Sequence, residues 1–203
     1  MIGSINFTIH ETAVVENKEN IGEGCVIGPF CSVGKNVILG RRVKLHSHVA
    51  IEGNTVIGDD TIIWPFASIG HQPQDLKYQG EFNRLNIGAR NKIRESVSIN
   101  PGTKGGGGLT TIGDDCLFML GSHVGHDCRI GNFVVVANNS AIAGHVVIRD
   151  NVTIGGLSGI HQFCRLGEGS MVGALSMVAN DIVPFGTVVG ERPKLSGLNL
   201  IGL

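Results

Sequence analysis

The chain has 203 residues, 42% of them hydrophobic, and a formal net charge of −1. It is long enough to bury a core, and it has no overall charge that would attract nucleic acid or anionic lipid. No cationic start precedes an apolar core, and no segment approaches about 20 uninterrupted apolar residues, so we expect a cytoplasmic protein without an integral membrane segment. The 31 glycines and only 5% aromatic residues suit many tight turns around a thin core, which is typical of a repeat protein.

A six-residue period runs through most of the chain. Large aliphatic residues, with one phenylalanine among them, recur at every sixth position in three runs: Ile9, Val15, Ile21, Ile27, Val33, Leu39, Leu45, Ile51, Ile57, Ile63 and Ile69, then Ile87, Ile93 and Ile99, then Ile112, Phe118, Val124, Ile130, Val136, Ile142, Ile148, Ile154, Ile160, Leu166, Val172 and Val178. Glycine often follows the aliphatic residue, and the fifth position of each hexad is usually small or β-branched. This is the hexapeptide-repeat pattern.

Each hexad predicts one short strand and one turn. The large aliphatic residue and the small residue two positions before it lie on the same face of a strand, so both point inward. Three hexads close one triangular coil of eighteen residues, and successive coils stack as parallel strands about 4.8 Å apart. We therefore predict an all-β fold, a parallel β-helix that forms one domain over residues 1–203. The sequence itself does not fix the handedness of the winding.

Two segments interrupt the register, at about residues 70–86 and 100–111. Insertions in a solenoid become loops on one face, often the face that binds ligands. The second insertion contains Thr103-Lys104 followed by four glycines, which invites interpretation as a phosphate-binding loop. The Walker spacing is absent and no helix is expected to follow, so we predict a flexible surface loop instead.

The cysteines fit the repeat better than they fit metal or redox chemistry. All five occupy the fifth, inward-facing position of a hexad: Cys25, Cys31, Cys116, Cys128 and Cys164. Buried cysteine acts there as a small hydrophobic residue, and the sequence has no CxxC spacing. We expect five buried thiols without a catalytic or metal-binding role.

Four histidines fall close together on the predicted winding. Because residues eighteen apart lie in one column, the hexads that begin at Val124, Ile142 and Ile160 stack directly. Their strands and turns bring a set of polar and glycine positions to one edge: His123, His126, Asp127, Gly144, His145, His161 and Gln162. Turn histidines that merely face water are the alternative, and spacing alone does not separate the two interpretations.

Three of these positions suit acyl transfer. His126 can remove a proton from a hydroxyl near neutral pH, and the neighbouring Asp127 can hold the imidazole in the useful tautomer. Gly144 has no side chain, so its backbone N–H can approach a substrate carbonyl as an oxyanion donor. A base, an orienting carboxylate and an oxyanion donor together predict acyl transfer.

Several segments resemble the UDP-N-acetylglucosamine O-acyltransferase family: Asp75-Leu76-Lys77-Tyr78, Ile93-Arg94-Glu95-Ser96, Gly125-His126-Asp127-Cys128, Ala143-Gly144-His145, His161-Gln162-Phe163-Cys164 and Gly197-Leu198-Asn199. The resemblance covers nearly the whole chain. It implies a left-handed β-helix and a homotrimer with its sites between subunits, working without a cofactor or metal. The implied reaction moves an (R)-3-hydroxyacyl chain from acyl carrier protein to the 3-hydroxyl of UDP-N-acetylglucosamine, the first step of lipid A biosynthesis.

The same resemblance implies roles for individual residues. The catalytic set is His126 as general base, Asp127 as its orienting residue and Gly144 as oxyanion donor. Positions that match the family's substrate groove are Asp75, Lys77, His123, His145, His161, Gln162 and Asn199. Ala174 matches the position that limits acyl-chain length, and we expect it to select intermediate-to-long chains.

Two features depart from the family's pattern. Asn100 stands where the family often has histidine, so a sugar or phosphate contact is expected to change. Relatives continue through an Arg-rich segment into a C-terminal helical domain, whereas this chain ends at Leu203. We expect residues 182–203 to begin that extension, and the helical domain to be absent from this chain.

Three other functions stay open on the sequence. A related N-acyltransferase acts on a UDP-glucosamine derivative later in the same pathway, but it normally has an additional N-terminal domain. A zinc enzyme similar to γ-class carbonic anhydrase uses three histidines on the same fold. A non-catalytic trimeric scaffold is the third, because a fold alone does not fix a function.

Overall fold

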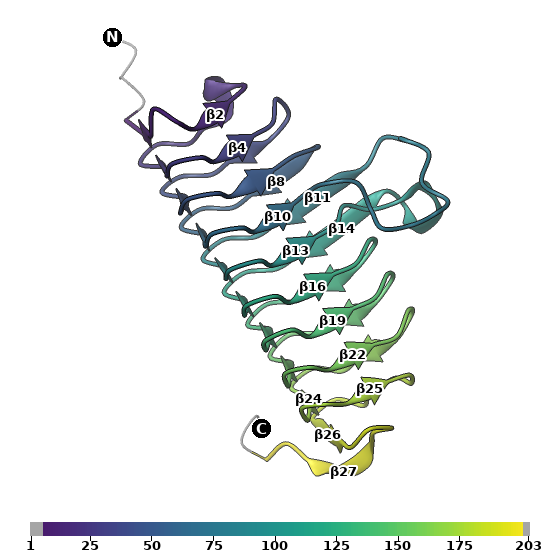
Figure 1. The fold of residues 1–203 in the computed structure, drawn as a ribbon. Helices are drawn as coiled ribbons and strands as arrows, with labels where there is room; N and C mark the ends of the chain where they lie inside the picture. The colour runs from purple at the N-terminus through teal and green to yellow at the C-terminus, as the bar shows by residue number, and fades with distance from the viewer. Residues whose placement is uncertain (1–5, 201–203) are drawn as a thin grey trace.

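The computed structural model describes residues 6–200, which form one stack of coils that leads from the N-terminal to the C-terminal end (Figure 1). Three sheets make up the sides of the stack, and each coil gives one short strand to each sheet. All strand pairs are parallel except the last, β26 with β27. The fold is the left-handed parallel β-helix that the hexads and the family resemblance together predicted.

The strands are two to five residues long and follow the hexads. The first sheet contains β1 (Thr8–Ile9), β3 (Val26–Ile27), β6 (Lys44–Leu45), β9 (Ile62–Ile63), β12 (Lys92–Ile93), β15 (Leu117–Phe118), β18 (Val135–Val136), β21 (Thr153–Ile154), β24 (Met171–Val172), β26 (Gly186–Val189) and β27 (Lys194–Leu198). The second contains β2 (Val14–Val15), β4 (Ser32–Val33), β7 (Ala50–Ile51), β10 (Ser68–Ile69), β13 (Ser98–Ile99), β16 (His123–Val124), β19 (Ala141–Ile142), β22 (Gly159–Ile160) and β25 (Met177–Val178). The third contains β5 (Ile38–Leu39), β8 (Thr55–Ile57), β11 (Arg84–Ile87), β14 (Leu109–Ile112), β17 (Arg129–Ile130), β20 (Val147–Ile148) and β23 (Arg165–Leu166).

The strand register confirms the eighteen-residue coil. Val124 pairs with Ile142, and Ile142 pairs with Ile160, as the hexad count requires. Across the two insertions the pairing resumes in phase, because Ile69 pairs with Ile99 and Ile99 pairs with Val124. The hydrophobic period therefore sets the winding even where the chain between two coils is longer.

The core is a single column of side chains inside the stack. Apart from Ile9 and Val15 in the N-terminal coil, which are only partly buried, every aliphatic residue of the six-residue series lies in this buried cluster. Phe118, the one aromatic member, is completely buried between its coil neighbours and fills the same inward position as an isoleucine. The cysteines are buried and free, as predicted, and stand between the aliphatic residues as small hydrophobic groups.

The buried thiols are expected to resist alkylation in the folded protein. Burial raises the pKa of Cys116 to about 11 and that of Cys128 to about 12, so both stay protonated at pH 8. Iodoacetamide at pH 8 should leave both unlabelled in the native protein and label both in denaturant, as mass spectrometry of the digested protein would show. Rapid labelling of either cysteine without denaturant would contradict this picture of the core.

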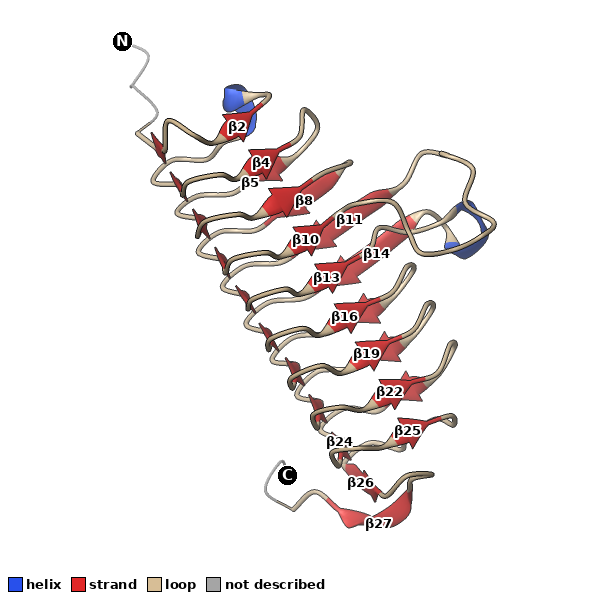
Figure 2. Ribbon diagram, viewed as in Figure 1, coloured by secondary structure: helices blue, strands red, loops and turns tan. Residues whose placement is uncertain are grey.

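Both insertions leave the coil at one corner, between the second and third sheets. The first covers residues 70–83 between β10 and β11, and the second covers residues 100–108 between β13 and β14 (Figure 2). Both loops end earlier than the expected residues 86 and 111. The reason is that β11 already begins at Arg84 and β14 at Leu109, where the two strands pair with each other. The two loops project side by side next to the coil that contains β16 and β17.

Helices are few in the part of the chain that the structure describes. They are two 3₁₀ turns, η1 at Lys18–Asn20 and η2 at Lys104–Gly106, the second within the second insertion. Neither has the length or apolar character that a membrane-crossing helix needs. The expected start of a C-terminal extension still follows the winding at first, since β26 pairs with β24, and it then turns back as β27.

Candidate active site

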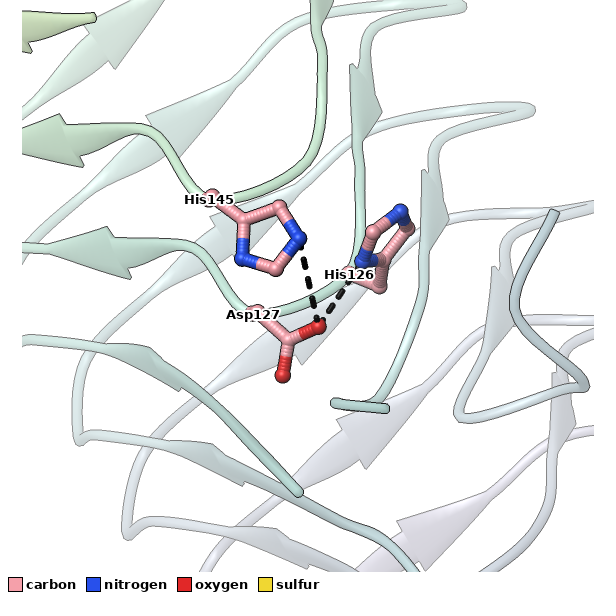
Figure 3. Close-up of side chains that lie close together, drawn as sticks. All are labelled: His126, Asp127 and His145. Carbon is pink, nitrogen blue, oxygen red and sulfur yellow. Dashed lines mark hydrogen bonds and ion pairs between the residues drawn. The ribbon is translucent and has the colours of Figure 1, made fainter. Parts of the chain in front are cut away.

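The turns that follow β16 and β19 bring the predicted catalytic residues together at the corner from which both insertions leave. His126 and Asp127 belong to the first turn, and Gly144 and His145 belong to the turn directly above it in the stack. The His145 backbone N–H donates to the His126 carbonyl over 2.9 Å, which joins the two turns. The columns predicted from the coil period are thus present, and Figure 3 shows three of the side chains facing one another.

His126 and Asp127 form a buried hydrogen-bonded pair. Nδ1 of His126 lies 2.8 Å from Oδ2 of Asp127, and the two residues are only 7% and 6% exposed. An ionised carboxylate only accepts hydrogen bonds, so we assign the imidazole proton to Nδ1. Nε2 is then the unprotonated nitrogen, and its lone pair is available to take a proton from a substrate.

His145 completes the cluster. Its ring stands perpendicular to that of His126, with 4.9 Å between ring centroids, and its Nε2 lies 4.0 Å from Asp127 Oδ2. The His145 ring also stacks on the ring of Phe163 in the next coil, with 4.5 Å between ring centroids and 7° between ring planes. Packing between coils therefore fixes the His145 imidazole, which is half-buried at the edge of the site.

Gly144 lies directly against the His126 ring. A Cβ atom built at Gly144 would be 2.6 Å from both Cε1 and Nε2 of His126, closer than atoms normally approach. Within residues 6–200, the Gly144 N–H has no hydrogen-bond acceptor. Glycine is thus required for the imidazole to occupy its place, and a free backbone donor lies next to the proposed base.

Two threonines that the sequence did not single out hold the Asp127 carboxylate and backbone. Thr103 donates its N–H to Oδ1 over 2.9 Å and its hydroxyl to Oδ2 over 2.6 Å. The Asp127 N–H in turn donates to Thr110 Oγ1 over 2.8 Å. No periodic signal marks Thr103, because it belongs to an insertion. Thr110 occupies the inward-facing fifth position of its hexad, two residues before Ile112, so the repeat predicts its burial but not its contact with Asp127. The prediction of a flexible surface loop was wrong for Thr103, which is 4% exposed.

A groove of about 400 Å³ runs from His126 along the outer face of the second sheet. Five residues of the predicted site line it: His123, His126, Gly144, His161 and Gln162. Its floor is smooth, because Ala141 and Gly159 occupy the outward strand positions. A narrow apolar chain would fit against such a surface.

His123 and Asn100 lie at the polar end of this groove. Nδ1 of His123 lies 2.7 Å from the Ser98 hydroxyl, and burial together with the nearby His126 lowers the pKa of His123. His123 is therefore neutral near pH 7. The Asn100 side chain is buried, lines the groove and accepts the Gln74 N–H over 3.4 Å, so a neutral amide stands where the family often has histidine.

A second hollow, of about 930 Å³, opens on the other side of His145. Asp75 and Lys77 of the first insertion line it together with Lys104 of the second. Phe163 and His145 form its inner wall. The charged lining is balanced, because Lys77 and Lys104 lie beside Asp75 and Glu81. The lysines can pair with an anionic group, and the aromatic wall can stack on a flat ring attached to it.

Two residues from the resemblance lie elsewhere in the single chain. The Asn199 amide donates to the Gly169 carbonyl over 2.8 Å, and its N–H donates to the Phe185 carbonyl, away from both hollows. Ala174 is exposed in the turn after β24, at the corner between the first and second sheets. The coil period does not bring either residue to His126 within one chain.

Metal binding was the alternative chemistry for this cluster. His126, Asp127 and His145 each offer a ligand atom, all within 4.8 Å of one another. Oδ2 of Asp127, however, already accepts from both the Thr103 hydroxyl and the His126 imidazole. His161 lies outside this group, whereas the zinc alternative used three histidines. The donor arrangement fits an oriented imidazole better than a metal centre.

Comparison with known proteins assigns the family. Residues 20–53 and 109–144 match the family described as bacterial transferase hexapeptide (six repeats). The chain is 63% identical over 139 residues to the acyl-[acyl-carrier-protein]–UDP-N-acetylglucosamine O-acyltransferase of Paracoccus denitrificans (strain Pd 1222), a match over 68% of this chain and 53% of that protein. It is 52% identical over 195 residues to the enzyme of the same name from Anaeromyxobacter dehalogenans (strain 2CP-1 / ATCC BAA-258), over 96% of this chain and 76% of that one.

A solved structure gives the same assignment in three dimensions. The UDP-N-acetylglucosamine acyltransferase from Campylobacter jejuni superposes with a TM-score of 0.91 at 39% identity, over 96% of this chain and 76% of that chain. The matched part spans about half of the Paracoccus relative and about three quarters of the other two proteins. The chain belongs to the family of the acyl-[acyl-carrier-protein]–UDP-N-acetylglucosamine O-acyltransferases.

Proposed function

We propose that the protein transfers an (R)-3-hydroxyacyl chain from acyl carrier protein to the 3-hydroxyl of UDP-N-acetylglucosamine, the first step of lipid A biosynthesis. The observation that carries the proposal is the arrangement at His126. Its Nδ1 is bound to Asp127, while its other side faces a smooth groove and the free N–H of Gly144. The family membership supports the identity of the two substrates.

The reaction follows from these three groups. His126 Nε2 takes the proton of the sugar 3-hydroxyl as its oxygen attacks the thioester carbonyl carbon. The negative charge that develops on the carbonyl oxygen is stabilised by the Gly144 N–H, and the imidazolium is stabilised by Asp127. When the intermediate collapses, the C–S bond breaks and the departing sulfur takes the proton from His126. The base is thereby restored, and neither a covalent acyl-enzyme nor a cofactor is required.

The two hollows provide sites for the two substrates. We assign the acyl chain to the groove on the second sheet and the nucleotide sugar to the hollow beside His145. In that hollow the positive charges of Lys77 and Lys104 can pair with the negative diphosphate. Gln162 and His161 line the groove assigned to the acyl chain. His123, neutral and bound to Ser98, provides a polar contact without adding charge.

We further propose that the protein acts as a cytoplasmic homotrimer. In a cyclic trimer the site of one subunit faces a neighbour, and Asn199 of that neighbour can reach the groove that it does not reach in its own chain. The partners are then acyl carrier protein and two further copies of this chain.

The decisive assay supplies both substrates in varied form. The protein is incubated with a series of (R)-3-hydroxyacyl carrier proteins and with either UDP-N-acetylglucosamine or its 3-amino analogue, and products are identified by mass spectrometry. An ester at the sugar 3-position supports the proposal, whereas exclusive reaction with the amine makes the enzyme an N-acyltransferase. Absence of acyl transfer to either acceptor, combined with stoichiometric zinc and hydration of carbon dioxide, would replace it with the zinc alternative.

Ala174→Met is expected to move the acyl preference towards shorter chains. Gly159 and Met177 line both the main groove and a hollow of about 410 Å³ at the corner where Ala174 lies, so the groove leads towards this residue. A longer side chain there would shorten the space for the acyl tail. The measurement is kcat/KM over the acyl series, with Ala137→Met as the control at the same corner two coils nearer the N-terminus. An unchanged preference would discard the length-limiting role.

A further inference from the structure

The glycine-rich stretch of the second insertion has no role in the reaction described so far. It resembles a phosphate loop in composition only, yet its first residue is buried against the catalytic carboxylate. We infer that Thr103 is a positioning residue, which holds Asp127 in the orientation that His126 requires, and that the glycines shape the loop for this purpose. The inference rests on the proposed function, since it assigns a role within the same reaction.

The carboxylate of Asp127 is held at both oxygens. Oδ1 accepts the Thr103 N–H over 2.9 Å, and Oδ2 accepts the Thr103 hydroxyl over 2.6 Å and His126 Nδ1 over 2.8 Å. The side chain is 1% exposed, so no competing water reaches it. Thr103 therefore supplies two of the three donors that fix the plane of the carboxylate and direct Oδ2 at the imidazole.

The loop also holds Thr103 itself in place. The N–H groups of Gly106 and Gly108 both donate to the Thr103 carbonyl, over 3.0 and 2.7 Å. A Cβ atom at Gly106 would overlap the carboxyl group of Asp127, so the loop backbone passes directly over the catalytic carboxylate. Gly107 adopts a φ of 96°, a left-handed conformation that ends η2 and turns the chain back. These glycines permit a close approach that side chains would prevent.

A buried carboxylate needs such support to be useful. Without donors it would be costly to keep ionised, and with a single donor it would be free to rotate about its Cβ–Cγ bond. Either change would weaken the bond to His126 Nδ1, which selects the tautomer with a basic Nε2. Thr103 lines the hollow assigned to the nucleotide sugar, but its hydroxyl is engaged by Asp127 Oδ2, so removal of the hydroxyl should affect the chemical step more than binding.

The first test compares variants at one position. Thr103→Val removes the hydroxyl with little change in shape and is expected to lower kcat by roughly 10- to 100-fold, the usual effect of losing a hydrogen bond to a charged group. KM for each substrate should change by less than about threefold if binding is spared. Thr103→Ser keeps the hydroxyl and should retain most of the activity. Thr111→Val is the matched control. Thr111 lies on β14, the strand that follows the second insertion, and its side chain has no hydrogen bond within residues 6–200.

A double-mutant cycle separates positioning from simple stabilisation. In an Asp127→Asn background, Thr103→Val should cost less than about threefold in kcat, because the carboxylate on which it acts is gone. Equal losses in both backgrounds, or full activity of Thr103→Val, would overturn the inference. If valine at 103 prevents folding, Thr103→Ala carries the same cycle, with the melting temperature measured for each variant. An inactive wild-type protein would instead refute the proposed function, so the two failures are distinguishable.

Discussion

His126→Ala is expected to lower kcat by about 10²- to 10⁴-fold, the usual contribution of a general base. His126 lines the groove beside Gly144, and its Nε2 is the nitrogen left free to act as a base because Nδ1 is bound to Asp127. Without it, the sugar hydroxyl has no group to take its proton as it attacks. Activity is measured with the preferred acyl carrier protein and UDP-N-acetylglucosamine, as kcat at saturating concentrations of both.

The stack of coils should survive this change, since the His126 side chain belongs to a turn and not to the inward-facing series. Circular dichroism and the oligomeric state of the variant are therefore expected to match the wild type. His10→Ala, at an exposed turn position in the N-terminal coil, is the matched control and should retain full activity. A variant at 126 that keeps more than about a tenth of wild-type kcat would exclude the general-base role.

Gly144→Ala is expected to lower kcat by about 10²-fold or more, because the added methyl group displaces the His126 imidazole from its place beside the oxyanion donor. The added methyl group would lie 2.6 Å from His126 Cε1 and Nε2, so the imidazole has to move while the backbone N–H is kept. The measurement is again kcat, together with the melting temperature to confirm that the fold is kept.

Gly156→Ala provides a control in the same position of another hexad turn. Its added Cβ would lie 3.3 Å from the nearest atom, the Asn138 carbonyl oxygen, which a small adjustment relieves. This variant should keep wild-type kcat within about twofold, as surface changes away from a site usually do. Equal losses for Gly144→Ala and Gly156→Ala would show that the effect comes from the turn backbone and not from the site.

The periodic part of the molecule could be predicted from the sequence because one physical rule determines it. An inward-facing residue at every sixth position sets the strands, the coil and the stacking, so the pairing of Val124 with Ile142 and Ile160 followed from counting. The same rule placed His126, Gly144 and His145 at one corner. These contacts are consequences of backbone register and need no knowledge of side-chain packing.

The contacts made by the insertions could not be predicted in this way. Thr103 reaches Asp127 through a loop whose path depends on its own hydrogen bonds and on Gly106 passing over the carboxylate. A composition of lysine and glycine is equally compatible with a free loop, so the sequence favoured the wrong interpretation. The place of Asn199 is a second case, because it lies away from the groove of its own chain and the coil period gives no reason to bring it there.

Both insertions begin after a strand of the second sheet and end at a strand of the third, and the register on either side is undisturbed. The coil is thus a rigid support with one open corner. Segments of different length and chemistry can be inserted there without changing the strands around them, provided that Thr103 and its contacts with Asp127 are kept. Diversification of acceptor sugars within such proteins is then expected to concentrate in residues 70–83 and 100–108, while the hexads change slowly. Transplanting these two segments together, as one unit, is the natural route to altering which nucleotide sugar is accepted.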